Sequence, residues 1–255
     1  MLLAVDIGNS HITLGVFSGE DLVFTARMVT DSKRTEDLYA VDIHSILALN
    51  NAVALRINSA IISSVVPELT EAMACAIKKA INIDAMVLGP GIKTGVNIKI
   101  DNPAQLGADL VAGAVAAIDQ YPLPCIICDL GTATTISVVD KEGNFLGGSI
   151  CAGVGITLDA LASKTALLPH IHIEKPNQPI GTNTVASMQS GLVYGTAAML
   201  DGMAERIEEQ LGEKATLVAT GGLSSKILPA CKREFIYNDN LLLDGLRLIY
   251  EKNKK

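Results

Sequence analysis

The feature that most constrains this chain of 255 residues is a short pattern that occurs twice. Near the start, the stretch LLAVDIGNSHITLGVF carries Asp6 and Gly8 between two apolar runs. The stretch CIICDLGTATTISVVD, more than a hundred residues later, repeats this order around Asp129 and Gly131. Each copy predicts two strands joined by a tight turn, with a carboxylate at the end of the first strand. A duplication at this distance predicts two domains of like topology.

Further apolar segments extend both copies. Runs of strand length cover residues 2–6, 11–17, 22–29, 60–65, 86–88, 96–100, 125–130, 135–140, 145–150 and 217–219. Patterns of helical spacing cover residues 35–49, 68–81, 105–119, 185–211 and 241–253. Three antiparallel strands followed by alternating helices and strands are typical of a ribonuclease-H-like domain. The predicted fold is therefore α/β, with two such domains at residues 1–120 and 121–255. Each is expected to hold a mixed five-stranded sheet flanked by helices, with a cleft between the domains.

Composition narrows the class of protein. Hydrophobic residues make up 49% of the chain and charged residues 18%, which favours a large core over disorder. The formal charge of −7 argues against a nucleic-acid-binding surface, which needs a basic face. No apolar run reaches the length of about 18 residues that a membrane span needs, and no signal peptide is visible. The five cysteines lie mostly in apolar stretches, which predicts reduced thiols and a cytoplasmic protein.

The turn residues of the two copies favour phosphate binding. Glycine and small polar residues let backbone N–H groups approach phosphate oxygens, and an aspartate at the strand end can hold a hydrated cation. A third turn, Thr220-Gly221-Gly222, follows a predicted strand and could approach an adenosine moiety or its phosphates. Ordinary hairpin turns and a helix-entry loop are the alternatives, but two matching copies favour a phosphate site. The candidate residues are Asp6, Gly8, Asn9, Ser10, Gly131, Thr132, Thr220, Gly221 and Gly222.

The stretch DNPAQLGADL, residues 101–110, predicts the start of a helix that carries an aspartate. Pro103 favours a helix start, and Asp109 then falls in the first turns. We expect the positive end of the helix to keep the pKa of Asp109 low. Such a carboxylate can still orient a hydroxyl, because the transition state of phosphoryl transfer is loose. The alternative is a surface aspartate that only complements the helix dipole.

Two other segments have open interpretations. The glycine-rich stretch from Gly147 to Gly155 could line an acceptor pocket or form a tight crossover. Thr184 precedes a long helical pattern and is expected to be its N-cap. Cys125 and Cys128 have the spacing of a metal knuckle, but they lie in a predicted strand without a second pair, which favours core thiols.

Taken together, the motifs resemble the type III pantothenate kinase family, within the superfamily of acetate and sugar kinases, actin and chaperone ATPases. The resemblance covers nearly the whole chain. It rests on Asp6-Ile7-Gly8-Asn9-Ser10, Gly107-Ala108-Asp109, Asp129-Leu130-Gly131-Thr132-Ala133-Thr134-Thr135, Gly147-Gly148, Ile180-Gly181-Thr182-Asn183-Thr184 with Ser190-Gly191, and Thr220-Gly221-Gly222.

The resemblance implies ATP-dependent phosphorylation of pantothenate, the first step towards coenzyme A, by a homodimer that uses Mg²⁺ and a monovalent cation, K⁺ or NH₄⁺. It implies that Asp109 accepts the proton of the pantothenate hydroxyl and that Asp6 serves the metal and phosphate. By the same resemblance, Asp129 binds the monovalent cation, Thr132 contacts phosphate, and Thr184 reaches the pantothenate of the partner subunit. The implied substrate-binding residues are Ile100, Gly107, Ala108, Asp109, Leu110 and Thr184.

Three positions depart from the family pattern. Leu110 stands where the family usually has arginine, Ile100 where an aromatic residue is common, and Ala152 where proline is frequent. The first two border the pantothenate pocket in the family, and leucine supplies none of the donors of arginine. The alternatives are therefore a paralogue that phosphorylates another small alcohol and a non-catalytic regulator that binds nucleotide.

Overall fold

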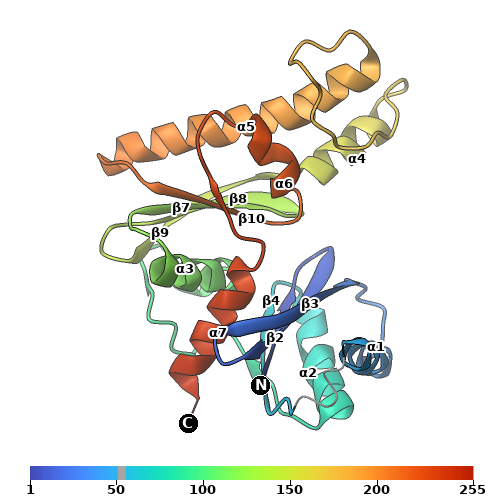
Figure 1. The fold of residues 1–255 in the computed structure, drawn as a ribbon, viewed down its shortest axis with the longest axis vertical. Coiled ribbons are helices and arrows are strands. Elements are labelled where there is room, and N and C mark those ends of the chain that lie inside the picture. Colours follow the sequence, from blue (N-terminus) through green and yellow to red (C-terminus); the bar gives the residue numbers. More distant parts are fainter. Residues whose placement is uncertain (51–55, 255) are drawn as a thin grey trace. The chain divides into compact units, whose positions relative to one another are not determined.

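The computed structural model describes residues 1–50 and 56–254, which form an α/β protein with two compact units. Unit 1 comprises Met1–Val96, Asp101–Ala116 and Asn240–Lys255, and unit 2 comprises Asn97–Ile100 and Ala117–Asp239. Each unit contains one mixed sheet with helices packed on it (Figure 1). None of the helices in the described ranges has the length and apolar character needed to cross a membrane.

The sheet of unit 1 has the order β3-β2-β1-β4-β5. Its strands are β1 (Leu2–Ile7), β2 (His11–Ser18), β3 (Asp21–Val29), β4 (Ser59–Ser64) and β5 (Met86–Val87). The first three strands form an antiparallel meander, whereas β4 runs parallel to β1 and β5 runs parallel to β4. The helices of this unit are α1 (Glu36–Leu49), α2 (Pro67–Ile81), most of α3 (Ala108–Gln120) and α7 (Leu241–Asn253).

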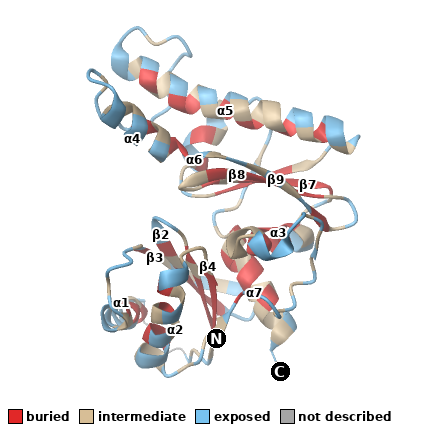
Figure 2. Ribbon diagram, turned by 180° about the vertical axis from the view of Figure 1, so that it is seen from behind, coloured by how far each residue is buried: buried red, intermediate tan, exposed pale blue. Residues whose placement is uncertain are grey.

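Both faces of the first sheet are covered, which explains why β1 is almost continuously apolar. On one face, Leu3, Val5 and Ile7 belong to a core that also contains buried residues of α1 and α2. The opposite face, which includes Asp6, packs against α7: a Cβ on Gly15 of β2 would stand 2.8 Å from Leu243. Figure 2 shows the resulting buried residues on the strands.

The sheet of unit 2 has the order β11-β10-β7-β8-β9-β6. Its strands are β6 (Asn97–Ile98), β7 (Cys125–Leu130), β8 (Ala133–Val139), β9 (Asn144–Ala152), β10 (Thr216–Thr220) and β11 (Ile236–Tyr237). Helices α4 (Val154–Lys164), α5 (Thr184–Leu211) and α6 (Ser224–Ile227) also belong to this unit, and residues of all three join one apolar core with β7, β8 and β10. The three-stranded meander is again followed by parallel strands, as the duplicated pattern predicts.

The α/β class with two like domains is confirmed, with three corrections of detail. The second sheet has six strands instead of five, because two short strands of two residues each, β6 and β11, flank the four longer ones. The helix predicted over 105–119 is preceded by a separate 3₁₀ turn, Pro103–Gln105. The N-cap of α5 is Asn183 rather than Thr184, because the Asn183 side chain accepts a hydrogen bond from the N–H of Ala186 at 2.9 Å.

The bounds of the two compact units also differ from the expected domains, residues 1–120 and 121–255. Helix α7 belongs to unit 1, since Gly245 lies so close to the backbone of Ala112 that no Cβ would fit between α7 and α3. Residues 97–100 belong to unit 2, because β6 pairs with β9.

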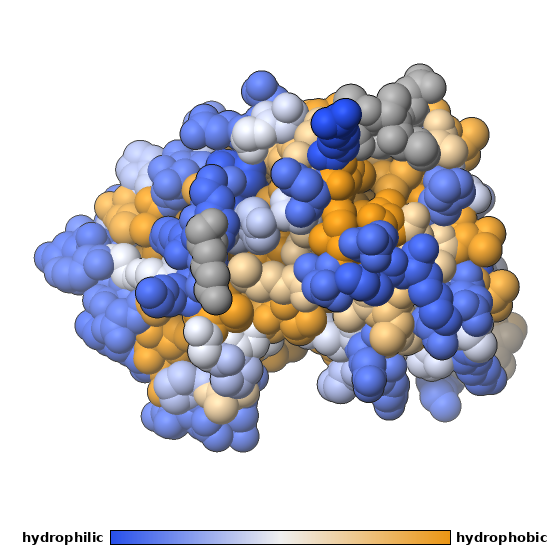
Figure 3. Space-filling model, turned by 90° about the horizontal axis from the view of Figure 1, so that it is seen from below, coloured by the Kyte–Doolittle hydropathy of each residue, from blue (hydrophilic) through white to orange (hydrophobic). Residues whose placement is uncertain are grey.

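On the face shown in Figure 3, hydrophobic and hydrophilic residues are interspersed. The exposed apolar side chains of unit 1 include Leu38, Val41 and Leu49 of α1.

Candidate functional site

The first glycine turn is a tight connection between β1 and β2. The N–H of Gly8 donates to the carbonyl of His11 at 3.0 Å, and Thr30 Oγ1 donates to the carbonyl of Gly8 at 2.7 Å. A Cβ on Gly8 would stand 3.1 Å from the His11 oxygen, so the turn is crowded. Asn9 and Ser10 are exposed at its tip. The N–H of Gly8 thus closes the hairpin, and the exposed part of the turn is formed by the next two residues.

Asp6 lies at the end of β1, where the parallel strand β4 also ends. Its partner in the β1–β4 register is Ser63, and the N–H of Val65 continues the ladder by donating to the carbonyl of Ile7 at 3.0 Å. Side chains of paired residues project from the same face of a sheet, so Asp6 and Ser63 are neighbours. Carboxyl ends of parallel strands are the usual place for ligands in α/β proteins.

The start of α3 adjoins this strand end within unit 1. A Cβ on Gly107 would stand 3.7 Å from Cγ1 of Val65, and it would collide with Oδ1 of Asp109. The N–H of Leu110 donates to Oδ1 of Asp109 at 2.7 Å, which fixes the carboxylate at the first turn of the helix. Gly107 and Ala108 are half-buried beside it. Gly107 therefore leaves the room that the Asp109 carboxylate occupies.

The pKa expected for Asp109 was wrong in direction. Burial raises the pKa of its carboxyl above the ordinary value of 3.8, and hydrogen bonds from the backbone N–H groups of Leu110 and Asp109 only partly oppose this. The helix N-terminus was expected to dominate, but removal from water penalises the anion more. Asp109 is consequently a stronger base than an exposed aspartate.

In unit 2, Asp129 occupies the place that Asp6 has in unit 1. Thr220 is its partner in the β7–β10 register, and Gly221 and Gly131 both approach its carboxylate. Gly221 has a φ of 92°, which favours glycine. The structure therefore brings the second and third predicted turns together around one carboxylate. The half-buried or exposed turn residues are Gly131, Thr132, Gly221 and Gly222.

Close packing explains some of the glycines in the segment from Gly147 to Gly155. A Cβ on Gly153 would collide with the carbonyl oxygen of Thr132, so the start of α4 packs directly on the second turn. Ile100 lies in unit 2, where a Cβ on Gly147 would stand 3.6 Å from its Cγ2. Ile100 thus borders the glycine-rich strand β9.

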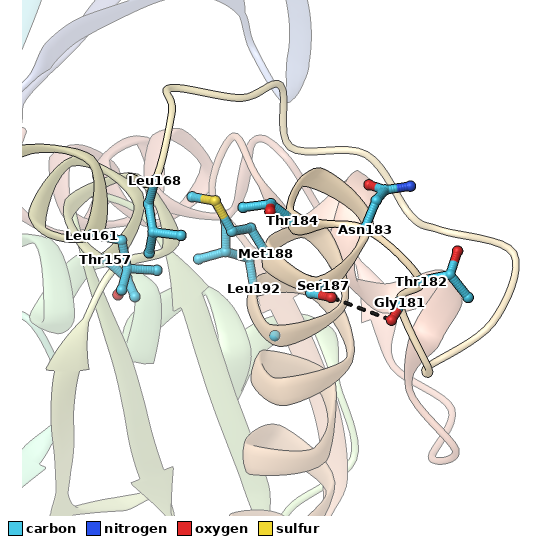
Figure 4. Close-up of a pocket in the computed structure, with 11 residues that line it drawn as sticks. Thr157, Leu161, Leu168, Gly181, Thr182, Asn183, Thr184, Ser187, Met188 and Leu192 are labelled. Atoms are coloured by element: carbon cyan, nitrogen blue, oxygen red, sulfur yellow. Dashed lines mark hydrogen bonds between the residues drawn. The ribbon is translucent and has the colours of Figure 1, made fainter. Parts of the chain in front are cut away.

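Thr184 lies apart from the turn residues, on a pocket of about 780 Å³ beside α4 and α5 (Figure 4). Leu161, Leu168 and Met188 give the pocket an apolar part. Thr184 is the first residue of α5 and is exposed, while Ser187 Oγ donates to the carbonyl of Gly181 at 3.3 Å. None of the three glycine turns contributes to the lining.

The polar groups of the turns suit a hard cation shared with phosphate. Asp6 and Asp129 offer carboxylate oxygens, and Ser63 beside Asp6 offers a hydroxyl. Within residues 1–50 and 56–254, no three histidine, cysteine or acidic side chains are grouped as a metal cage. Mg²⁺ commonly binds through one or two carboxylates and the phosphates of its substrate, so the Asp6 carboxylate and the neighbouring hydroxyl in unit 1 fit it.

The two α/β units, each with an aspartate and a glycine turn at the end of its first strand, define the fold class of this protein. The fold resembles a protein from Campylobacter jejuni assigned to the Baf family of transcriptional activators, with a TM-score of 0.63, 18% identity and 98% of each chain covered. It also resembles the activator of 2-hydroxyisocaproyl-CoA dehydratase from Clostridium difficile with bound ADPNP. That match has a TM-score of 0.54 and 15% identity, and it covers 100% of this chain and 98% of the other.

Sequence comparison identifies the family within this class. Residues 2–206 match the family model of type III pantothenate kinase. The chain is 42% identical over 254 residues to a type III pantothenate kinase from Brevibacillus brevis, with 100% of both chains covered. The chain therefore belongs to the type III pantothenate kinase family.

Proposed function

We propose that this protein phosphorylates pantothenate to 4′-phosphopantothenate with ATP, in the first step of coenzyme A synthesis. The observation that carries the proposal is the full-length relationship to a type III pantothenate kinase. The position of Asp109, fixed at the start of α3 beside the strand end that carries Asp6, is consistent with this function.

The chemical step is an in-line transfer. The primary hydroxyl oxygen of pantothenate forms a bond to the γ-phosphorus of ATP while the bond from that phosphorus to the bridging oxygen breaks, and ADP leaves with the electron pair. We propose that Asp109 orients the hydroxyl and accepts its proton. A raised pKa makes the carboxylate a better acceptor for this proton. Positioning and electrostatic stabilisation supply most of the rate enhancement in such reactions.

Asp6 and the turn after β1 are proposed to hold Mg²⁺ and the phosphates. Bound Mg²⁺ would neutralise charge that develops on the transferring phosphoryl group. Asn9 and Ser10 are exposed at the tip of the turn, where backbone and side-chain donors can meet phosphate oxygens. Asp6 is at the carboxyl end of β1, which is the usual end for such ligands.

The turns of unit 2 are proposed to hold the rest of the nucleotide and a monovalent cation. Thr132 would contact phosphate, and Thr220-Gly221-Gly222 would allow the adenosine part to approach the backbone. Asp129, enclosed by Gly131 and Gly221, would bind K⁺ or NH₄⁺. Carboxylate oxygens are hard ligands of the kind that such cations bind.

A second candidate function, phosphorylation of another small alcohol, arises from the residues at the proposed acceptor pocket. Leu110 stands where the family usually has an arginine, and Ile100 stands where it commonly has an aromatic residue. However, the contact that Leu110 makes with Asp109 uses its backbone N–H, which any residue except proline provides. This geometry favours a pocket that keeps its catalytic aspartate and changes only its acceptor affinity.

A coupled assay of ADP release, with Mg²⁺ and K⁺ present, separates these functions. We expect ADP release to be faster with pantothenate than with any other hydroxyl compound in a panel of small alcohols. No pantothenate-dependent ADP release would refute the proposed function, and a better substrate in the panel would support the second candidate. The Leu110→Arg variant should lower the KM for pantothenate if the pocket is only weakened.

We also propose a cytoplasmic homodimer in which Thr184 reaches the pantothenate of the partner subunit. The exposed position of Thr184 on the pocket beside α5 supports this role, and the five free cysteines are consistent with a reducing compartment. Mixing inactive Asp109→Asn and Thr184→Ala subunits should restore part of the activity, since one of the two sites then has both residues. No restoration in mixed dimers would contradict the shared site.

A further inference from the structure

The hydroxyl of Ser63 has no role in the fold itself. Ser63 is fully buried (0% exposed), and its Oγ has no hydrogen-bond partner among the residues that the structure describes. By contrast, the adjacent Ser64 Oγ donates to the carbonyl of Val66 at 3.0 Å. A buried hydroxyl without a hydrogen-bond partner destabilises the folded state, so alanine at position 63 would be better for stability alone.

The place of Ser63 in the sheet indicates a ligand. It is paired with Asp6 in the parallel register of β1 and β4, on the face opposite the main core of unit 1. Val65, two residues further on, lies near the start of α3, because its Cγ1 would be 3.7 Å from a Cβ on Gly107. The unpartnered hydroxyl therefore lies at the strand end that carries Asp6 and adjoins the helix start that carries Asp109.

The second unit has the same arrangement at the equivalent place. Thr220, also buried, is paired with Asp129 in the parallel register of β10 and β7. Both units thus place a hydroxyl residue beside the aspartate that ends the first strand. This repetition indicates that the hydroxyl at position 63, like that of Thr220, belongs to a ligand-binding strand end. The turn after β4 differs in that it lacks the glycines of the turn after β10.

We propose that Ser63 is a positioning residue of the phosphoryl-transfer site. Its hydroxyl donates a hydrogen bond to an oxygen held beside the Asp6 carboxylate, supplied by a metal-bound water or by a phosphate group of the nucleotide. The ligand oxygen satisfies the buried hydroxyl and is oriented by it. The inference rests on the proposed function, because it requires a metal–nucleotide complex at Asp6.

The variants Ser63→Ala and Ser63→Thr test this role, with Ser59→Ala as the matched control. Ser59 is on the same strand and face, but at the opposite end, where its Oγ donates to the carbonyl of Met1 at 3.2 Å. Three quantities are measured for each variant. They are the melting temperature without ligand, the Kd for a non-hydrolysable ATP analogue with and without Mg²⁺, and the KM values for ATP and pantothenate.

We expect Ser63→Ala to melt no lower than wild type and to bind the Mg²⁺–nucleotide complex about tenfold more weakly, the effect of about 1.4 kcal/mol from one hydrogen bond to a charged group. The KM for pantothenate should not change, and Ser63→Thr should restore nucleotide affinity. A loss that disappears without Mg²⁺ assigns the contact to metal-bound water, and a loss that persists assigns it to phosphate.

Other results overturn the proposal. A Ser63→Ala variant with the affinity of Ser59→Ala would remove Ser63 from the site. A lower melting temperature without ligand than that of Ser59→Ala would show that the hydroxyl serves the fold, and a Ser63→Thr variant as weak as Ser63→Ala would remove the hydroxyl as the cause. If wild-type protein binds no Mg²⁺–nucleotide, the proposed function itself fails.

Discussion

Oδ1 of Asp129 lies 2.5 Å from the point where a Cβ on Gly221 would stand. The backbone N and C atoms of Leu130 are each 2.7 Å from the same point. Gly221 also has a φ of 92°, which favours glycine. The third turn of the sequence therefore closes directly on the carboxylate that ends the first strand of unit 2. Only a residue without a side chain allows this approach.

The Gly221→Ala substitution should displace the Asp129 carboxylate and strain the turn. We expect it to lower the free energy of unfolding by more than about 2 kcal/mol, because a left-handed conformation alone costs about 1–2 kcal/mol and the clash adds to it. Activation by K⁺ should weaken at the same time. Denaturant titration and assays at varied K⁺ concentration measure the two effects.

Gly212→Ala is the matched control for this variant. Gly212 caps α5 with a φ of 76°, and no heavy atom lies within 4 Å of a Cβ at that position. It should therefore show only the conformational cost, about 1–2 kcal/mol, with a normal response to K⁺. Equal effects of the two alanine variants on stability and on K⁺ response would contradict the role assigned to the contact with Asp129.

The Asp109→Asn substitution should separate activity from stability. We expect kcat to fall by at least about a hundredfold, because asparagine cannot accept the hydroxyl proton. The melting temperature should stay the same or rise at neutral pH, because burial disfavours the charge that the substitution removes. Steady-state kinetics and thermal melts on the same samples test both statements. Near-normal kcat would exclude Asp109 as the proton acceptor.

The pH dependence of the rate should show the raised pKa of Asp109. The reaction needs the ionised carboxylate, so kcat/KM should fall on acidification through the pKa of Asp109, which burial raises above 3.8. The acid limb is therefore expected at a higher pH than for an exposed aspartate. In Asp109→Asn, the residual rate should lose this limb. An acid limb at or below the ordinary aspartate value would show that the carboxylate is solvated in the working enzyme.

Much of the fold could be predicted because it is encoded in local periodicity. The two hairpins that begin at Leu2 and Cys125 have apolar runs and glycine turns in matching order, and the structure places them in equivalent sheets. The assignment of α7 to unit 1 could not be predicted in this way. It depends on the close approach of Gly245 to Ala112, more than a hundred residues apart in sequence.

The site was predicted less completely, for two physical reasons. The pKa of Asp109 depends on burial by neighbours that the sequence does not identify, so the local helix argument gave the wrong direction. Ser63 was missed because its importance comes from strand register with Asp6 and from an unpartnered hydroxyl. The only available signal was its equivalence to Thr220 after the duplication is extended to β4 and β10.

The Asp129→Ala substitution should reduce the dependence on monovalent cation. If Asp129 binds K⁺, loss of its carboxylate removes the main charged ligand, and the rate should become nearly independent of K⁺ at a low level. Activity measured over a K⁺ series, with Na⁺ at constant ionic strength, tests this. Asp140 offers a control carboxylate in the same unit, because it is paired with Lys99 and hydrogen-bonded to Asn144 in a turn. An unchanged K⁺ response in Asp129→Ala would refute the assignment.

A buried ion pair beyond these turns should govern acid stability. Glu208 of α5 is only 4% exposed, and its carboxylate accepts hydrogen bonds from Arg233 at 2.7 Å, Lys214 at 2.7 Å and the N–H of Ala215 at 3.2 Å. Burial alone would raise the pKa of Glu208, but these donors outweigh it and lower the pKa from 4.5 to about 2. The carboxylate therefore stabilises the fold above pH 4.5, and this contribution is lost as the pH falls towards 2.

We expect Glu208→Gln to lower the free energy of unfolding at pH 7 by about 2–3 kcal/mol, because Arg233 loses its charged partner in a mostly buried site. The difference from wild type should shrink on acidification below pH 4.5, since the wild-type carboxylate is then progressively protonated. Asp84→Asn is the control, because its ion pair with Lys78 is exposed and should contribute less than about 1 kcal/mol. Urea titrations at several pH values measure these differences. Equal losses in the two variants, or a difference that stays constant with pH, would show that the Glu208 charge does not stabilise the end of α5.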